Sequence, residues 1–567
     1  GSRVMYSIAQ SIDTDVLVMG GGIAGLMAAI ASADRGAKVI VAEKANTRRS
    51  GSGATGNDHF RCWIPEKHGP DYRVIMNEVL NFSQFGLCHD TVLTRRFLEK
   101  SFDIVKMWDA WGIPMRPTGD WEFTGHAFPG RIRSALKYDG AQQKPILTRE
   151  ARKRGAGILN HHAVIELLAE DGEIAGALTL DTSRDEPAFT LIRAKCVVVA
   201  TGCTTRLYVN KATPGWMFNT AFCPGNAGGG IAQSFRAGAK LVNLELATRH
   251  AGPRYFERAG KSTWIGVYKY PDGRTLGPFV SKPTKELGDI TSDIWNASFT
   301  EVVKNGSGPA YLDCSETSPE DLAYMRWGMK GEGLTALLDY MDREGIDPAR
   351  HAVEFMQYEP FLIGKGLDVD INGQCSLPGL YAAGDVVGNF RADIGGAAVY
   401  GWISGDHAGT SAAGRTLRGS LERHPAVERT LALCADIMKR GERGYAWDEA
   451  NMAVQQLMSD YAPAGPFEKR SESLLDAGLH YMRALRGKSR AGLGAVCSHT
   501  LLRALESLDL MDVGEALMVA ARERRESRGP HLRADYTFTN PMLGELFLDV
   551  FLREGEIQTE WRKRNMV

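Results

Sequence analysis

The sequence predicts an α/β fold in which a parallel-sheet domain is interrupted by an insertion and followed by a helical domain. Three observations predict it: a strand–glycine–helix–strand unit near the start, two later apolar segments that return to the same sheet, and a long helical pattern towards the end. The chain has 567 residues, of which 44% are hydrophobic. This length and this apolar content allow two or three domains, each with a full core.

The first unit has the order typical of a dinucleotide site. Asp15–Met19 and Lys38–Ala42 are apolar enough to be buried strands, and Ile23–Arg35 has the apolar spacing of a helix. Glycines between the first strand and the helix let the backbone approach a pyrophosphate, which then faces the positive end of the helix dipole. Glu43 follows the second strand, where an acid suits ribose hydroxyls. We expect these residues to bind a dinucleotide: Gly20, Gly22, Ile23, Ala24, Gly25, Glu43 and Lys44.

Two segments far down the chain return to the predicted sheet. Cys196–Gly202 and Gly379–Asp385 are apolar strands that end in glycine turns, and a helix is expected from Gly395 to about Ala413. Between them and the first unit, residues 164–180 carry two apolar runs around an Asp-Gly turn, which predicts a β-hairpin. We therefore predict a first sheet domain over residues 1–245 that resumes over 353–414.

The remaining segments differ in pattern from the sheet domain. Residues 246–352 are rich in aromatics, prolines and glycines, and we interpret them as an inserted α+β domain. From residue 415 long amphipathic runs predict a helical domain over 415–567.

Composition narrows the classes of partner. Lys plus Arg number 67 and Asp plus Glu number 68, so the net charge of −1 gives no electrostatic reason to expect nucleic acid or an anionic membrane. The sequence shows neither a transmembrane run nor a signal-peptide pattern, and we expect a cytoplasmic protein. Nine dispersed cysteines without a C-x-x-C pair argue against a disulfide framework, a zinc site or a cluster bound by this chain. The pair His161–His162 points to opposite faces of a strand, so we expect no metal there.

The order of motifs resembles a known family of flavoproteins. The segments GGGIAGLMAAI, EKANTRRSGSGATG, AGAKLVNLE, LPGLYAAGD, IGGAA and RERRESRGPHLRADY follow one another as in the flavoprotein subunits of succinate dehydrogenase and fumarate reductase. L-aspartate oxidase and the alpha chain of adenylylsulfate reductase are relatives in that superfamily. The resemblance implies a two-part Rossmann-like FAD-binding domain, an inserted α+β capping domain and a C-terminal helical domain.

The resemblance also implies which further residues bind FAD. They would contact the phosphates, the adenine, the ribityl chain and the flavin ring. The residues are Ser50, Gly51, Gly56, Val164, Ala200, Thr201, Gly202, Gly384, Asp385, Gly395, Gly396, Ala397 and Ala398. Members that bond their flavin present a His directly after an Arg-Ser pair. Here Gly51 follows Arg49 and Ser50, so we expect non-covalent FAD.

Several positions depart from the family's substrate site. Ser292 stands where the family has its proton-donating Arg, Asp393 where it has a substrate Arg, and Phe361 near the place of a substrate His. Gly366 stands where adenylylsulfate reductase has a His, whereas His250 matches a substrate-contacting His. We therefore expect a small anionic substrate other than fumarate or succinate.

Seven residues are candidates for the chemistry, each with a structural alternative. They are His250, Arg249, Arg254, Arg391, Asp393, Lys365 and His59. Arg249, His250 and Arg254 cluster at the entry to the insertion, where they would bind an anion and donate a proton. The alternatives are a salt-bridged domain junction, a core-packed His and a solvated loop Lys.

Three functions follow as hypotheses. The first is an FAD-dependent oxidoreductase that moves a hydride between flavin N5 and a carbon of the substrate. The second is a redox-neutral hydratase or lyase that uses reduced FAD, as in flavin-dependent haloacrylate hydratases. The third, compatible with the first, is a flavoprotein subunit that exchanges electrons with an iron–sulfur or ferredoxin-type partner; a homo-oligomer is left open.

Overall fold

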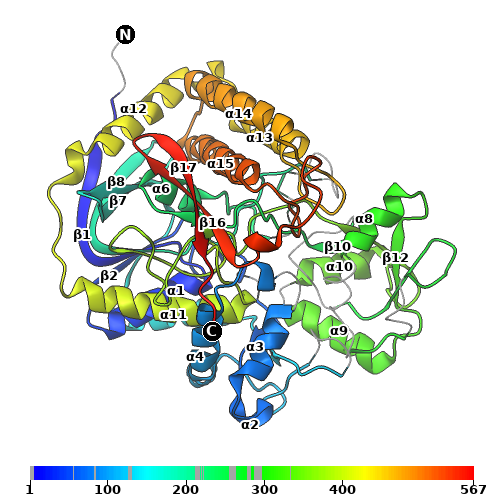
Figure 1. Ribbon diagram of the computed structural model, residues 1–567. Coiled ribbons are helices and arrows are strands. Elements are labelled where there is room, and N and C mark those ends of the chain that lie inside the picture. The colour runs from blue at the N-terminus through cyan, green and yellow to red at the C-terminus, as the bar shows by residue number, and fades with distance from the viewer. Residues whose placement is uncertain are drawn as a thin grey trace.

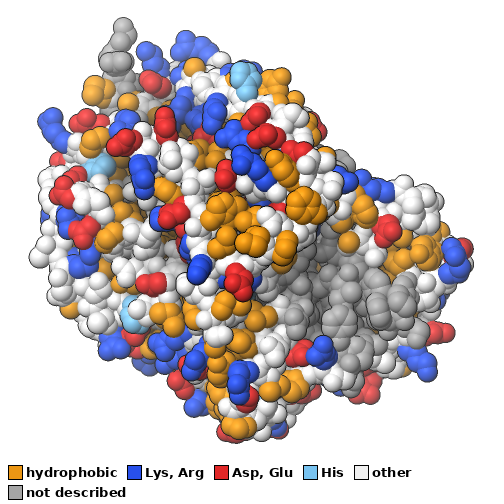
Figure 2. All heavy atoms as spheres, viewed as in Figure 1, with side chains coloured by type: hydrophobic (Ala, Val, Ile, Leu, Met, Phe, Trp, Pro, Cys, Tyr) orange, Lys and Arg blue, Asp and Glu red, His pale blue; other side chains and the backbone are white. Residues whose placement is uncertain are grey.

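The computed structural model describes residues 5–54, 56–81, 85–124, 130–210, 217–218, 220, 222–254, 264–276, 282–285, 296–331 and 334–567. They form a large body that holds the central sheet and the long helices, and a smaller lobe beside it (Figure 1). Charged side chains of both signs are interspersed over the face shown in Figure 2, in keeping with the near-zero net charge.

The central sheet has the strand order β5-β2-β1-β8-β7-β6, and β15 also pairs with β8. Its parallel strands are β1 (Ile8–Met19), β2 (Val39–Ala42), β5 (Gly157–Leu159), β8 (Ala188–Val199) and β15 (Leu380–Ala382). The antiparallel hairpin β6 (His162–Glu170) and β7 (Glu173–Asp181) extends the sheet. Parallel pairing brings the carboxyl ends of β1, β2, β8 and β15 to one edge, which is where α/β sheets bind their ligands.

Two helices pack tightly together against the parallel strands. They are α1 (Ile23–Asp34) and α11 (Asp393–Ala412), and glycines allow their close approach. A Cβ atom at Gly401 or Gly405 would collide with the backbone of Ala24 or Ala28 on α1. The other elements of the large body before β5 and between β8 and β9 are α2 (Pro65–His68), α3 (Tyr72–Asn81), η1 (Phe85–Leu87), α4 (Thr91–Ala110), α5 (Gln143–Lys153), α6 (Gly229–Arg236) and the small sheet of β3 (His59–Arg61) and β4 (Ala135–Lys137).

The smaller lobe has its own sheet and core. Its antiparallel strands follow the order β10 (Ala251–Pro253), β13 (Val353–Gln357), β12 (Ala310–Asp313) and β11 (Val267–Lys269). Its helices are α8 (Asn296–Lys304), α9 (Pro319–Gly331) and α10 (Thr335–Glu344). Tyr268, Phe299 and Phe355 meet edge to face in this core, separate from the core of the large body.

Beyond α11 the chain is mainly helical and then ends in strands. The helices are η3 (Leu421–Arg423), α12 (Pro425–Arg440), η4 (Gly441–Arg443), α13 (Trp447–Tyr461), α14 (Glu472–Gly492), α15 (Ser498–Glu523) and η5 (Pro541–Leu543). The hairpin of β16 (Leu546–Arg553) and β17 (Glu556–Lys563) joins β9 (Leu241–Val242) and β14 (Gly366–Leu367) in a further sheet. Among the described helices, none combines the length and the apolar character needed to cross a membrane.

The structure confirms the predicted sheet, its first helix and the hairpin, with two differences. The first strand begins at Ile8, upstream of the apolar run, because its polar start still pairs with β8. The terminal region is not helical throughout, because Leu546–Arg553 is buried as a strand between β9 and β17.

Candidate functional site

The turn between β1 and α1 is shaped by two tightly packed glycines. Gly20 has a φ of +99°, and a Cβ atom there would lie 2.5 Å from the carbonyl oxygen of Ala200. A Cβ atom at Gly25 would lie inside contact distance of the Gly20 carbonyl oxygen. At Gly22, the residue before α1, the described atoms leave the Cβ position open. The helix N-terminus is thus accessible to a phosphate group from one side.

A large cavity begins at this turn. It has a volume of about 1220 Å³, including space open to solvent, and follows the carboxyl edge of the sheet. The predicted cofactor residues in its wall are Gly20, Gly22, Ile23, Ala24, Glu43, Lys44, Ser50, Gly51, Val164, Ala200, Thr201, Gly202, Gly384, Asp385 and Ala397. The backbone-rich wall at the carboxyl edge of the parallel strands suits an extended dinucleotide.

The other predicted cofactor residues lie behind this wall. Gly25 supports Gly20, and a Cβ atom at Gly395 would collide with the backbone of Arg61. A Cβ atom at Gly396 would lie 3.1 Å from the ring of Phe390. The remaining two are Gly56, which packs against the carbonyl of Gly331, and Ala398, which is buried in the core. These small residues allow close packing of the elements that form the cavity.

The helix α15 supplies a side of the cavity that the sequence did not indicate. Its contributions are Leu502, Leu505, Glu506 and Asp509. Lys44 binds Glu506 at 2.7 Å and so joins α15 to the end of β2. Helical periodicity predicted α15, but periodicity does not reveal which partner a helical face meets.

A buried lysine lies under the glycine turn. Lys144 on α5 is fully buried, and its Nζ donates a hydrogen bond to the carbonyl oxygen of Gly21. Burial lowers the pKa of Lys144 to about 8, although the Glu43 carboxylate opposes the shift. A cation here would stabilise the negative charge of a bound pyrophosphate. Lys144 was not assigned a role in cofactor binding from the sequence.

Charged side chains gather at the start of α11, and we call His59, Arg61, Arg391 and Asp393 the α11 cluster. Asp393 is the first residue of α11 and has a φ of +51°. Arg61 Nε donates to its Oδ2 at 3.2 Å, and Arg391 Nη2 lies 2.8 Å from Oδ1. His59 Nε2 lies 3.7 Å from Oδ2, and His59 Nδ1 lies 2.8 Å from Asp58 Oδ1. Asp393 therefore holds three cations together.

The cluster changes the protonation of its members. Burial alone would lower the pKa of His59, but the carboxylates of Asp393 and Asp58 outweigh it and raise the pKa to about 9. Burial would raise the pKa of Asp393, but Arg391, His59 and Arg61 hold it well below its usual range. His59 is therefore an imidazolium and Asp393 a carboxylate at neutral pH.

Asp385 connects the cluster to the cavity. It lines the cavity and lies 3.8 Å from Arg391 Nε. Burial raises the pKa of Asp385 to about 6, while Arg391 opposes the shift. On the other side, Arg391 donates its backbone N–H to Nε2 of His89, whose pKa burial and the nearby Lys365 lower to about 3. The neutral His89 was not identified from the sequence.

The other catalytic candidates make different contacts. Lys365 is buried, with Nζ 3.2 Å from Thr248 Oγ1. The His250 ring packs at 5.3 Å against each of two aromatic rings, Phe222 and Phe361. Phe361, which was expected near the place of a family His, thus packs with His250 and Phe222 and has no charge of its own.

The two arginines beside His250 engage protein groups. Arg249 donates from Nε to the carbonyl of Tyr358 at 2.9 Å and from Nη1 to the carbonyl of Ala464 at 3.2 Å. Arg254 binds Glu354 at 2.9 Å across β10 and β13. These contacts resemble the domain-junction alternative. Ser292 lies outside the described residues.

Metal binding finds no support in the part of the chain that the structure describes. No group of three or more His, Cys, Asp or Glu side chains in that part is placed to hold a metal ion. His161 has a φ of +59°, and the neighbouring His162 ring contacts the carbonyl of Asn160 at 2.8 Å.

Comparison with known proteins identifies the family. Residues 15–397 match the family described as FAD binding domain, and residues 452–566 match the one described as fumarate reductase flavoprotein C-term. The chain is similar to a component of the fumarate reductase (CoM/CoB) of Methanothermobacter marburgensis, with 25% identity over 94% of this chain and 96% of that protein. It is also similar to an L-aspartate oxidase of Vibrio cholerae, with 25% identity over 92% and 95%.

Solved structures show the same fold. An adenosine-5-phosphosulfate reductase in complex with sulfite aligns with a TM-score of 0.83 and 20% identity, covering 100% of this chain and 98% of that one. An E. coli quinol fumarate reductase flavoprotein aligns with a TM-score of 0.78 and 19% identity, covering 98% of each chain. Together with the cavity, these matches show that the chain is an FAD-dependent oxidoreductase and belongs to the flavoprotein superfamily of succinate dehydrogenase and fumarate reductase.

Proposed function

We propose that the protein transfers a hydride between flavin N5 and a carbon atom of a small anionic organic substrate other than fumarate or succinate. The observation that carries this proposal is the α11 cluster, which meets the FAD cavity through Asp385. Bound FAD supplies the hydride donor or acceptor. The chain's own residues must then bind the anion, exclude water and deliver a proton.

Anion binding is assigned to the cations of this region. Arg391 and Lys365 flank Asp385 and supply positive charge beside the cavity. A second carboxylate, as in fumarate, would face Asp393 and the apolar ring of Phe361, where the family resemblance implies an Arg and a His. Repulsion by Asp393 and the lost hydrogen bonds at Phe361 would disfavour a dicarboxylate.

Proton delivery is assigned to His59. Its pKa of about 9 keeps it protonated at neutral pH, as a general acid requires. Asp58 holds Nδ1 at 2.8 Å, whereas Nε2 is 3.7 Å from Asp393 and is the nitrogen better placed to release a proton. In the reducing direction a proton from Nε2 would reach the carbon next to the one that receives the hydride.

Two further assignments belong to this proposal. FAD is held non-covalently, because Gly51 stands where bonding relatives carry the attaching His; denaturation with acid should release all flavin into the supernatant. An iron–sulfur or ferredoxin-type protein exchanges electrons with the chain, since relatives are named as subunits of fumarate reductases. Co-expression with an adjacent small Cys-rich chain and co-purification would test this partner.

The decisive experiment is an anaerobic titration. The flavin is photoreduced, a panel of small unsaturated acids is added, and the visible spectrum and product mass are recorded. We expect one class of acid to reoxidise the flavin and to gain two hydrogens. Substitution of His59→Asn should slow reoxidation by about 100-fold or more while FAD remains bound, and His351→Asn, at an exposed site of the smaller lobe, serves as the control.

Two outcomes would contradict the proposal. A product that gains water or loses halide while the flavin stays reduced would establish the redox-neutral reaction. Equal rates for His59→Asn and the unsubstituted protein would remove His59 from the chemistry.

A further inference from the structure

A second cavity lies against the FAD cavity on the side of the C-terminal helices. It encloses about 1080 Å³, including space open to solvent, between β6, the end of α6, and the helices α12, α14 and α15. Ile165, Leu505 and Asp509 line both cavities and form the wall between them.

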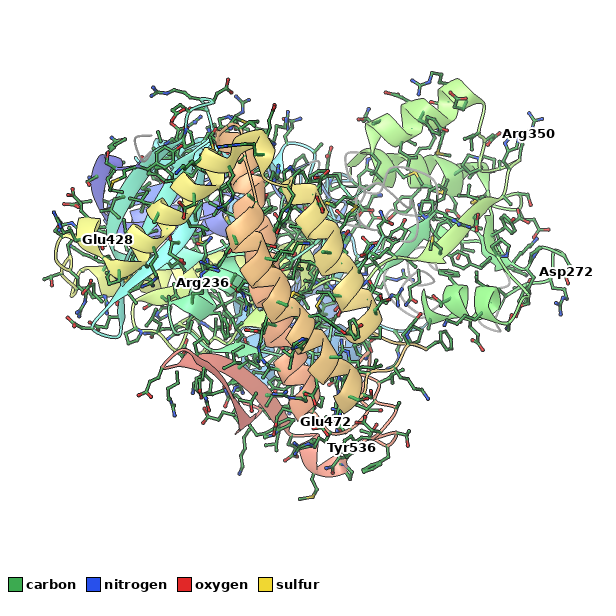
Figure 3. The ribbon with its side chains drawn as sticks, turned by 90° about the horizontal axis from the view of Figure 1, so that it is seen from above. Arg236, Asp272, Arg350, Glu428, Glu472 and Tyr536 are labelled. Atoms are coloured by element: carbon green, nitrogen blue, oxygen red, sulfur yellow. The ribbon has the colours of Figure 1, made fainter. Side chains whose placement is uncertain are left out.

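The wall of this second cavity is unusually rich in charge. Its arginines and carboxylates are Arg236, Arg429, Arg486, Arg490, Glu166, Asp509 and Asp512. They come from β6 and from four different helices, so the fold collects them from distant parts of the chain. Figure 3 shows Arg236 on the same side of the molecule as Glu428 of α12, away from Arg350 in the smaller lobe.

The carboxylates are all engaged by two of the arginines. Arg236 lies 3.2 Å from Glu166, 2.9 Å from Asp509 and 2.7 Å from Asp512. Arg486 lies 2.8 Å from Asp512. This network joins β6, α6, α14 and α15. Arg236 and Arg486 therefore have a structural role, because they hold these elements together.

The other two arginines of the wall, Arg429 and Arg490, do not take part in this network. Arg429 of α12 and Arg490 of α14 are exposed at the cavity, and within the described part of the chain neither guanidinium has a carboxylate partner. His424, which also lines the cavity, accepts at Nδ1 from the N–H of Ala426, and its Nε2 lies 2.8 Å from the carbonyl oxygen of Ala169. Four arginines line the cavity against three carboxylates, so its wall has one more positively than negatively charged side chain.

We propose that this second cavity binds a small phosphorylated molecule, with Arg429 and Arg490 holding the phosphoryl group. Guanidinium groups bind phosphate oxygens through paired N–H donors, and two of them from different helices can enclose one phosphoryl group. The rest of the ligand would lie between α12 and β6, next to Ile165 and Leu505. This proposal does not rest on the hydride transfer proposed above.

The position of the site also connects it with the cofactor. Arg236 lines the second cavity and binds Asp509, and Asp509 faces the FAD cavity. An anion that attracts Arg236 would weaken its contact with Asp509 and so alter the wall next to FAD. Ligand binding should therefore change the FAD dissociation constant, by mutual linkage of the two sites.

The test measures binding to the FAD-saturated, oxidised protein by isothermal titration calorimetry, with inorganic pyrophosphate as the probe and citrate as a carboxylate comparison. We expect one saturable pyrophosphate site per chain. The double substitution Arg429→Gln/Arg490→Gln should weaken binding at least tenfold, and Arg429→Lys/Arg490→Lys should recover part of it. Arg350→Gln, an exposed arginine in the smaller lobe, should have no effect.

Several results would overturn the proposal. They are no saturable binding, binding that the double Gln variant leaves unchanged, and equal losses in Arg350→Gln. Tighter binding of citrate than of pyrophosphate would overturn the assignment of a phosphoryl group. Because the assay involves no turnover, these outcomes are distinct from failure of the hydride-transfer proposal.

Discussion

The glycine turn of the FAD cavity is formed by backbone atoms, whereas the α11 cluster is formed by charged side chains. The turn consists of backbone, and its shape depends on Gly20 and Gly25, where a side chain would collide with carbonyl oxygens. The cluster consists of charged side chains from β3, from the start of α11 and from Arg391 just before it. Its two parts are more than three hundred residues apart in the sequence, as for the pair Arg61 and Asp393. The first region lines the cavity that suits FAD, and the second includes Asp393, where the family resemblance implied an Arg.

This difference shows where function can change within one fold. A backbone-built site tolerates few substitutions, because each position is fixed by sterics. A side-chain cluster can be exchanged as long as its charges remain balanced, as Asp393 is by Arg61 and Arg391. We therefore expect substitutions in the turn to abolish cofactor binding and substitutions in the cluster to change the chemistry with FAD in place.

The largest effect is expected at Gly25. The substitution Gly25→Val places a side chain against the Gly20 carbonyl oxygen and should leave the purified protein without FAD. Gly487→Ala is the matched control, because this helical glycine of α14 has no described atom within 4 Å of its Cβ position. The ratio of flavin to protein absorbance measures the result, and circular dichroism checks the fold. A fully loaded Gly25→Val protein would contradict the steric argument.

The next effect concerns stability and pH. The folded protein raises the pKa of His59 from 6.5 to about 9, so the stabilisation from its proton is complete below pH 6.5 and is lost as the pH rises to about 9. The shift corresponds to about 3 kcal/mol. Urea denaturation at pH 6 and pH 9.5 should therefore show that His59→Asn costs more stability at the lower pH. An equal cost at both values would show that His59 is not protonated in the fold.

Sequence reasoning succeeded where a local pattern carries the structure. Strand, glycines and helix adjoin one another at residues 15–35, and the Asp171–Gly172 turn, with φ of +51° and +74°, joins two paired strands. These features depend on neighbouring residues and can be read directly from the sequence.

It failed where the structure depends on tertiary contacts. Nothing near Asp509 in the sequence indicates that this residue of α15 would face the FAD cavity. Likewise, Arg61 was not identified, although it follows His59 by two residues on β3 and such residues share one face of a strand. Asp393 was a candidate, but its contact with Arg61 arises from the tertiary fold, so sequence spacing could not identify the pair.

A smaller effect on cofactor affinity is expected at Lys144. The substitution Lys144→Met keeps much of the side-chain volume but removes the cation beneath the glycine turn, and the FAD dissociation constant should rise about tenfold, or about 1.4 kcal/mol. Lys153→Met, at the exposed end of the same helix, is the control. Flavin fluorescence during dilution measures the affinity. An unchanged constant would mean that backbone alone determines binding at this end of the cavity.

The smallest effect tests the cluster itself. In Asp393→Asn the imidazolium of His59 loses one of its two carboxylate partners but keeps Asp58 at 2.8 Å. Its pKa should fall, and the alkaline limb of the pH profile for flavin reoxidation should move down by about one pH unit, since one unit corresponds to about 1.4 kcal/mol of differential interaction. Asp406→Asn on the same helix, where the half-buried carboxylate pairs with Arg35, should leave the profile in place. If the profile of Asp393→Asn does not move while its rate falls, Asp393 acts on the substrate directly. The cluster would then contain a carboxylate that contacts the substrate. In that case Asp393 could not be exchanged for another charge-balanced arrangement, and the cluster would be as restricted in sequence as the glycine turn.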